Sequence, residues 1–121
     1  MNRRETGDSG EKIACNFLCN NGYTILETNY RCRSGEIDIV AKHRDMLVFV
    51  EVRTKKSFKF GTPEESITLT KMQHLRDVAV HYEQHHVNLP EQWRIDVVAI
   101  QMHGNGKVCR VELIENAIED V

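Results

Sequence analysis

The sequence lacks several features that would place its 121 residues in a familiar class of protein. No apolar run approaches the length of a membrane span, and residues 1–9 contain no hydrophobic stretch that would act as a secretory signal. We therefore expect a cytoplasmic protein with no membrane partner. The four cysteines form no C-x-x-C pair, which favours reduced thiols over a zinc ribbon.

The motifs of three common enzyme classes are also missing. Residues 104–107 (GNGK) lack the spacing of a phosphate-binding loop, and His81 and His85 lack the correctly placed glutamate of a zinc-protease H-E-x-x-H helix. No serine has the sequence context of a hydrolase nucleophile. The chemistry of this protein must therefore come from other residues.

Positive charge is in slight deficit overall but is unevenly distributed. The formal net charge is −2, which argues against an indiscriminate nucleic-acid binder. Between residues 31 and 59, however, eight Lys or Arg stand against four Asp or Glu. This segment would attract a nucleic-acid backbone, although Lys-rich segments are also common as ordinary solvated surface.

Two neighbouring segments carry acidic side chains inside apolar runs, residues 35–40 (GEIDIV) and 48–53 (VFVEVR). Strand interiors are depleted in Asp and Glu, so these acids need a reason. Both segments alternate, which predicts strands with Glu36 and Asp38 on the face opposite to Ile37 and Ile39. In the second strand, the same alternation puts Glu51 and Arg53 together on one face.

The short polar break between the segments predicts an antiparallel hairpin that turns around Arg44-Asp45. In that register Asp38 faces Glu51, with Cβ atoms roughly 5 Å apart, where two like charges destabilise each other unless a cation lies between them. Mg²⁺ or Mn²⁺, which prefers oxygen ligands, would fit there. Arg53 could then stabilise a phosphate or a developing negative charge.

A simpler interpretation stays open at this point. The acids could form the solvated side of an ordinary hairpin, with Glu36 and Arg53 as a cross-strand ion pair. A slip of one residue in the register would also put the acids on opposite faces and remove the metal site.

Residues 35–40 and 49–53 closely resemble the signature of the YraN-like family of small bacterial proteins. The resemblance extends over most of the chain, through Gly10-Glu11, Ala14, Gly22-Tyr23, Asn29, Phe60-Gly61, Pro63, Lys71 and residues 94–98. The family is similar to Holliday-junction resolvases. This implies a single domain over residues 1–121 with the α/β restriction-endonuclease-like fold, a mixed central sheet flanked by helices in the order α-β-β-β-α-β-β.

The resemblance also implies a function and a set of site residues. It implies an endonuclease that uses Mg²⁺ or Mn²⁺ to hydrolyse phosphodiester bonds in DNA, branched or structured DNA included. Asp38 and Glu51 match the metal ligands, with the Val52 carbonyl as a further ligand. Glu11 matches a helix-borne acid that approaches the metal, and Glu36 belongs to the signature.

Arg53 departs from the family pattern, which usually has lysine at this point. Arginine keeps the positive charge but cannot give up its proton, which excludes it as a general base. Lys55, on the same strand face, could partly substitute. The wider set of candidate nucleic-acid-binding residues is Lys55, Lys56, Lys71, Arg31 and Arg33. Lys71 could touch a phosphate or water near the metal, or simply be exposed to solvent.

Two functions from different classes therefore remain. One is a metal-dependent nuclease, which would be a homodimer if it cuts symmetric junctions. The other is a DNA-binding or partner-binding module that keeps the fold without turnover, with Arg53 as the sign of that loss.

The pattern of apolar residues predicts the elements that carry these side chains. We expect helices at about 9–21 and 68–86, with strands at about 24–32, 36–42, 47–54, 94–101 and 108–114. Asp8 and Glu11 resemble a capping box at the start of the first helix, and Gly22 resembles its end. Residues 58–61 resemble a mobile loop near the substrate.

Overall fold

A computed structural model describes residues 3–56 and 61–117, with side chains from residue 9 onward. The elements run in the order helix, three strands, helix and two strands, with one short 3₁₀ helix before the second α-helix. They are α1 (Arg3–Asn20), β1 (Thr24–Cys32), β2 (Gly35–His43), β3 (Met46–Lys55), η1 (Glu64–Ser66), α2 (Leu69–His85), β4 (Trp93–Met102) and β5 (Val108–Ile114). The predicted element order is confirmed.

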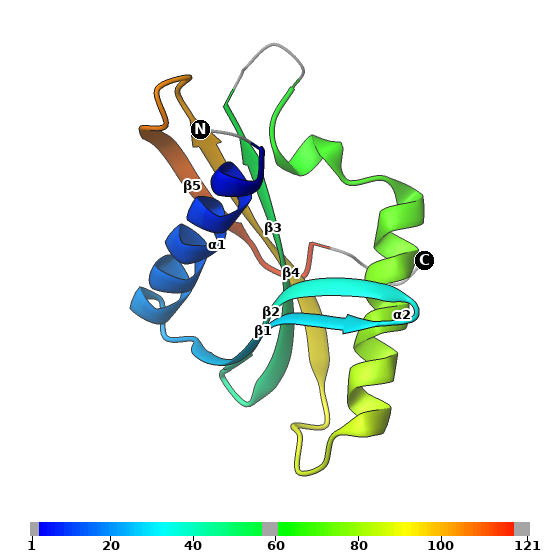
Figure 1. Cartoon of the computed structure of the whole chain (residues 1–121). Helices are drawn as coiled ribbons and strands as arrows, with labels where there is room; N and C mark the ends of the chain where they lie inside the picture. Colours follow the sequence, from blue (N-terminus) through cyan, green and yellow to red (C-terminus); the bar gives the residue numbers. More distant parts are fainter. Residues whose placement is uncertain (1–2, 57–60, 118–121) are drawn as a thin grey trace.

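The five strands form one mixed sheet in the order β1-β2-β3-β4-β5. All neighbouring pairs are antiparallel except β3 and β4, which are parallel and are joined by the connection that contains α2. The two helices lie on opposite sides of the sheet (Figure 1). None of the described helices combines the length and the apolar character needed to cross a bilayer.

Each helix covers its own hydrophobic core. Ala14 and Leu18 of α1 pack with side chains that include Val48 and Val50 of β3. On the other face, the buried stripe of α2 packs with side chains that include Phe49. Alternate residues of β3 thus enter opposite cores, as the period of a strand buried on both faces requires.

The turn between β2 and β3 has the predicted position and register. Arg44 and Asp45 have φ angles of 49° and 63°, the left-handed values that a tight two-residue hairpin needs at both central positions. The strands pair from His43 with Met46 to Ile39 with Val50. The predicted hairpin is therefore confirmed as far as the pair Ile39 and Val50, which directly precedes Asp38 and Glu51 in the register.

The start of α1 differs from the prediction. The helix begins at Arg3 rather than near residue 9, so Asp8 and Glu11 are inside it and the predicted capping box is wrong. Arg3, Arg4 and Glu5 are good helix formers and extend the helix at little cost. Its end is as predicted: Gly22 has φ 86° and the Tyr23 N–H donates to the Leu18 carbonyl.

Other parts of the prediction need small adjustments. From its apolar spacing, Met72 is expected to be buried in α2 together with Leu75, Val78, Ala79 and Tyr82; those four are buried, whereas Met72 is only partly buried. Except for Gly61, the predicted loop at 58–61 lies outside the described residues. All four cysteines are free.

Gly10 sets the approach of α1 to β3, because a Cβ atom there would lie 2.3 Å from Thr54 Oγ1. We expect Gly10→Ala to lower the free energy of unfolding by about 1–3 kcal/mol through overpacking, although alanine is the better helix former. In a Thr54→Ala background the same change should be neutral or stabilising. Urea denaturation of the four proteins in this cycle measures the coupling, and a Gly10→Ala variant as stable as the wild type would contradict the close packing.

Candidate active site

The candidate site lies where β2 leaves β3. Pairing between these strands ends at Ile39 and Val50, whereas β1 and β2 stay paired as far as Cys32 and Gly35. The far half of the β1–β2 hairpin therefore departs from the sheet and passes toward α2 (Figure 1). Asp38 and Glu51 are the first residues beyond this fork, one on each strand.

The hairpin bends at the same place, which the regular alternation of the sequence did not predict. Ile39 belongs to the core under α1, whereas Ile37 belongs to the core under α2. In a regular strand both would share one face, so the prediction that they do is wrong. On β1, Asn29 lies at the level of Asp38 and has φ 54°. Tyr30, the residue after it, packs on α2.

The bend brings the carboxyl groups of Asp38 and Glu51 together. Asp38 Oδ2 accepts a hydrogen bond of 2.8 Å from the Val52 N–H. Burial raises the pKa of Asp38 from 3.8 to about 8, helped by a hydrogen bond to Glu51 and by its charge. This raised pKa favours a protonated Asp38 at neutral pH, which can donate to the Glu51 carboxyl group beside it. Glu51 itself is 5% exposed. The predicted meeting of these two acids is what the structure shows, and the pair needs a proton or a cation to be stable.

Two cationic side chains reach Glu51 on the α2 side of the sheet. Arg53 Nη2 lies 3.4 Å from Glu51 Oε2, and Lys71 Nζ of α2 lies 3.3 Å from the same oxygen. The ammonium of Lys71 also acts to lower the pKa of Asp38, against the larger effect of burial. The placement of Glu51 and Arg53 on one strand face is as predicted.

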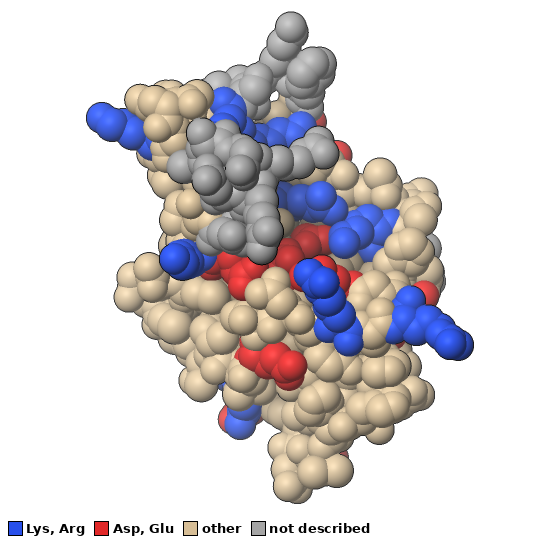
Figure 2. Space-filling model, in the orientation of Figure 1, with Lys and Arg blue, Asp and Glu red and all other residues tan. Residues whose placement is uncertain are grey.

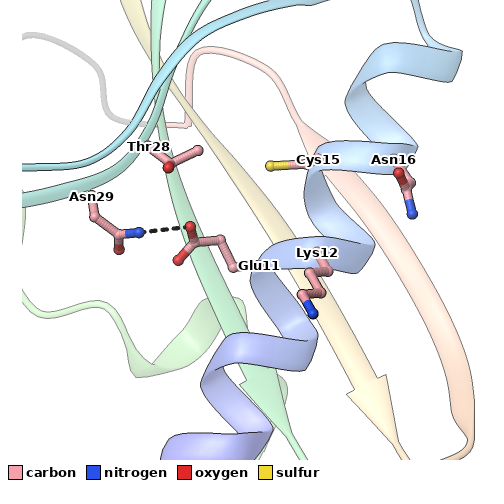
Figure 3. Close-up of a pocket in the computed structure, with 6 residues that line it drawn as sticks. All are labelled: Glu11, Lys12, Cys15, Asn16, Thr28 and Asn29. Carbon is pink, nitrogen blue, oxygen red and sulfur yellow. Dashed lines mark hydrogen bonds between the residues drawn. The ribbon is translucent and has the colours of Figure 1, made fainter.

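Glu11 approaches the fork from α1. Its Oε1 accepts a hydrogen bond of 2.9 Å from Asn29 Nδ2, drawn as a dashed line in Figure 3, and Asn29 stands beside the level of Asp38 on the neighbouring strand. Between α1 and β1 there is a groove of about 570 Å³, whose lining is Glu11, Lys12, Cys15, Asn16, Thr28 and Asn29. Within the described ranges, no three His, Cys, Asp or Glu side chains gather closely enough to hold a metal ion. Glu11 as a third ligand therefore stays a prediction.

Glu36 does not pair with Arg53. It lies beyond the fork, and its carboxylate is 3.2 Å from Arg31 Nε on the partner strand β1. The cross-strand pair suggested by extending the β2–β3 register is therefore wrong, because the hairpin has already left β3 at this point. This surface ion pair is worth little stability, since the Arg31 side chain is 75% exposed.

The remaining predicted basic residues occupy two places. Lys55 ends β3 and Lys56 follows it, while Arg33 lies in the turn between β1 and β2. In the view of Figure 2, acidic atoms lie near the centre of this face and basic side chains lie around them. The basic side chains would attract an anionic ligand, and the acidic groups between them would attract the cations that accompany it.

Comparison with known proteins identifies the family. The model of the family described as "Uncharacterised protein family UPF0102" matches residues 10–100. The chain belongs to the UPF0102 family. A UPF0102 protein of Caldicellulosiruptor saccharolyticus is 47% identical over 97% of this chain and 99% of its own, and one of Moorella thermoacetica is 44% identical over 97% and 98%. A relative in Clostridium novyi is 38% identical over 92% of both chains. The resemblance to the YraN-like family is thereby confirmed.

This UPF0102 chain also contains a buried polar cluster around Asp96, which was not predicted from the sequence. Asp96 is fully buried and accepts hydrogen bonds from Arg94 Nε, the Tyr23 hydroxyl and the Asn116 N–H, at 2.8–2.9 Å. Arg94 also contacts His43, whose ring stacks on Tyr23 at 4.0 Å. Because both carboxylate oxygens of Asp96 have partners, the cluster fits a structural role in joining β4 to the connection between α1 and β1 and to the segment after β5. The sequence signals were the acid and base two residues apart in an apolar strand and the family resemblance at Tyr23 and residues 94–98.

The proton held by Asp38 predicts how stability depends on pH. A carboxyl group with a higher pKa in the folded state than in the unfolded state stabilises the fold most at low pH, and this stabilisation is lost as pH rises from about 4 to about 8. Asp38→Asn removes the titrating group, so the stability of the wild type relative to this variant should fall across that range. Urea denaturation in EDTA at several pH values measures the difference.

Asp45→Asn is the matched control, because Asp45 is exposed in the β2–β3 turn. It should leave the pH dependence of the wild type unchanged. A parallel pH dependence in Asp38→Asn and the wild type would show that Asp38 is not protonated in the folded state.

Proposed function

We propose that this protein is a metal-dependent nuclease that hydrolyses phosphodiester bonds in DNA, on a domain of the restriction-endonuclease-like type. The observation that carries the proposal is the meeting of the Asp38 and Glu51 carboxyl groups at the fork of β2 and β3, with the cations of Arg53 and Lys71 against them. The mixed sheet covered by one helix on each side is compatible with that fold type.

The carboxyl pair fits a hard divalent cation such as Mg²⁺ or Mn²⁺. The two groups are close enough to share a hydrogen bond, and they already attract two cationic side chains. Mg²⁺ is commonly held by one or two carboxylates together with waters and substrate phosphate, so two acids suffice. Asp38 and Glu51 would hold the ion, with the Val52 carbonyl and Glu11 as candidate further ligands. Such an ion polarises a phosphate and makes a bound water more acidic.

The other residues have roles that follow from their positions. The bend at Asn29 and Asp38 aims the Asp38 carboxyl at Glu51, and the Val52 N–H holds it there. Asn29 keeps Glu11 beside the fork. Arg53 would bind a non-bridging phosphate oxygen, while Lys55, Lys56, Arg31 and Arg33 would contact the DNA backbone farther away. Glu36, paired with Arg31, would shape that part of the surface.

Metal binding tests the site directly. We expect calorimetry to show Mn²⁺ binding to the wild type and to a control Asp77→Ala, because Asp77 is exposed on α2 and bonds to Gln73. Asp38→Ala should weaken the binding by about a hundredfold or more, since it removes one of two central ligands. Binding that is unchanged in Asp38→Ala would overturn the proposed metal site.

Cleavage assays separate the nuclease from a binding module. Labelled branched, flap and single-stranded DNA should be cut by the wild type in Mn²⁺, and neither Asp38→Ala nor the wild type in EDTA should cut them. DNA that is bound by the wild type without any cleavage would favour the module that lacks turnover. Sedimentation of the active protein tests the homodimer that paired cuts in a symmetric junction would need.

A further inference from the structure

The Glu51 carboxylate is contacted by two cations from different elements. Arg53 comes from the same strand, two residues along, where the nucleases that this chain resembles have lysine. Lys71 comes from α2 and reaches the same oxygen, Oε2, at 3.3 Å, compared with 3.4 Å for Arg53. The chain thus has a lysine ammonium at this carboxylate, although its motif position carries arginine.

Arg53 is arranged for holding an anion. Its Nε atom is buried and has no hydrogen-bond acceptor among the described residues. A buried N–H without an acceptor is costly, so this guanidinium group gains from a further anionic partner such as a phosphate. The guanidinium group also presents several donors in a fixed plane, which suits a phosphate better than a single water molecule.

The backbone of Lys71 is fixed by a hydrogen bond in the first turn of α2, whereas its ammonium is partly exposed. It lies in the first turn of α2, where its N–H donates to Oγ1 of the N-cap Thr68 at 3.1 Å. The side chain is 34% exposed and its ammonium lies 3.3 Å from Glu51 Oε2, so the ammonium is partly open to solvent. An ammonium has three protons, and one contact with Glu51 leaves two for other acceptors.

We propose that Lys71, rather than Arg53, is the catalytic cation of the reaction, and that Arg53 is mainly a phosphate-binding residue. The inference rests on the proposed nuclease function. The oxygen of a water molecule forms a bond to phosphorus while the bond to one sugar oxygen breaks. The attacking water loses a proton to solvent, and the leaving oxygen gains one from solvent. Lys71 donates hydrogen bonds to the non-bridging oxygen on which negative charge increases.

This assignment explains how an arginine in the motif is compatible with turnover. The positive charge that the transition state requires comes from α2 across the fork instead of from β3. It also gives the two residues different kinetic signatures. A group that acts on charge developed in the transition state changes kcat, whereas one that binds the substrate phosphate throughout changes KM.

Steady-state cleavage of a flap DNA in Mn²⁺ tests this division. Lys71→Ala should lower kcat by about a hundredfold and change KM by threefold or less. Lys71→Arg should recover part of that loss. Arg53→Lys, which keeps the charge but removes Nε, should raise KM and leave kcat within about tenfold of the wild type. Lys107→Ala is the charge-matched control, because Lys107 is exposed beyond β4, and it should behave as the wild type.

Two binding measurements distinguish a catalytic role from a structural one. Lys71→Ala should bind Mn²⁺ at least as tightly as the wild type by calorimetry, because a cation that competes for Glu51 has been removed. Its dissociation constant for the flap DNA in Ca²⁺ should stay within threefold of the wild type. If Lys71→Ala loses Mn²⁺ binding together with cleavage, Lys71 only maintains Glu51 and the proposal is wrong.

The proposal and the nuclease function fail in different ways. Full kcat in Lys71→Ala, with Asp38→Ala inactive, overturns the role of Lys71 and leaves the nuclease intact. A wild-type protein that cleaves none of the DNA substrates overturns both.

Discussion

The candidate site depends on the close approach of the Asp38 and Glu51 carboxyl groups in a largely buried position. Two such groups cannot both be ionised at this separation without a positive charge between or beside them, and burial makes the penalty larger than it would be in water. In this structure the repulsion is relieved by the Val52 N–H and by the cations of Arg53 and Lys71, and the raised pKa of Asp38 favours a proton on that group. A divalent cation would relieve it in the same way and with more charge. The local instability of this pair is therefore what makes it suited to binding a metal ion.

The rest of the fold serves to hold that pair in place. The antiparallel pairing of β2 and β3 stops one residue before the acids, so the strands are held together up to the point where they separate. Hydrophobic cores pack on both faces of β3 next to the fork. The helices then bring side chains from opposite sides: Glu11 from α1, through its bond to Asn29, and Lys71 from α2.

The contrast with the buried cluster around Asp96 shows why one set of charges suggests chemistry and the other does not. The charge of Asp96 is neutralised by Arg94, and two further donors complete the hydrogen bonds of its carboxylate. The pair at the fork is instead contacted by the Val52 N–H and by two cationic side chains that remain about one-third exposed. A buried charge that is fully paired stabilises a specific packing. A buried acid pair whose cationic partners are partly exposed is a candidate ligand site.

The sequence by itself determined the elements, the turn at Arg44-Asp45 and, through the period of two, the shared face of Glu51 and Arg53. These are local properties, set by turn geometry and by alternation along one strand. It could not determine the bend at Asn29 and Asp38, the pairing of Glu36 with Arg31, or the arrival of Lys71 at Glu51. Those depend on how the hairpin leaves the sheet to pack against α2. That packing joins residues far apart in the chain, and only the tertiary structure decides it.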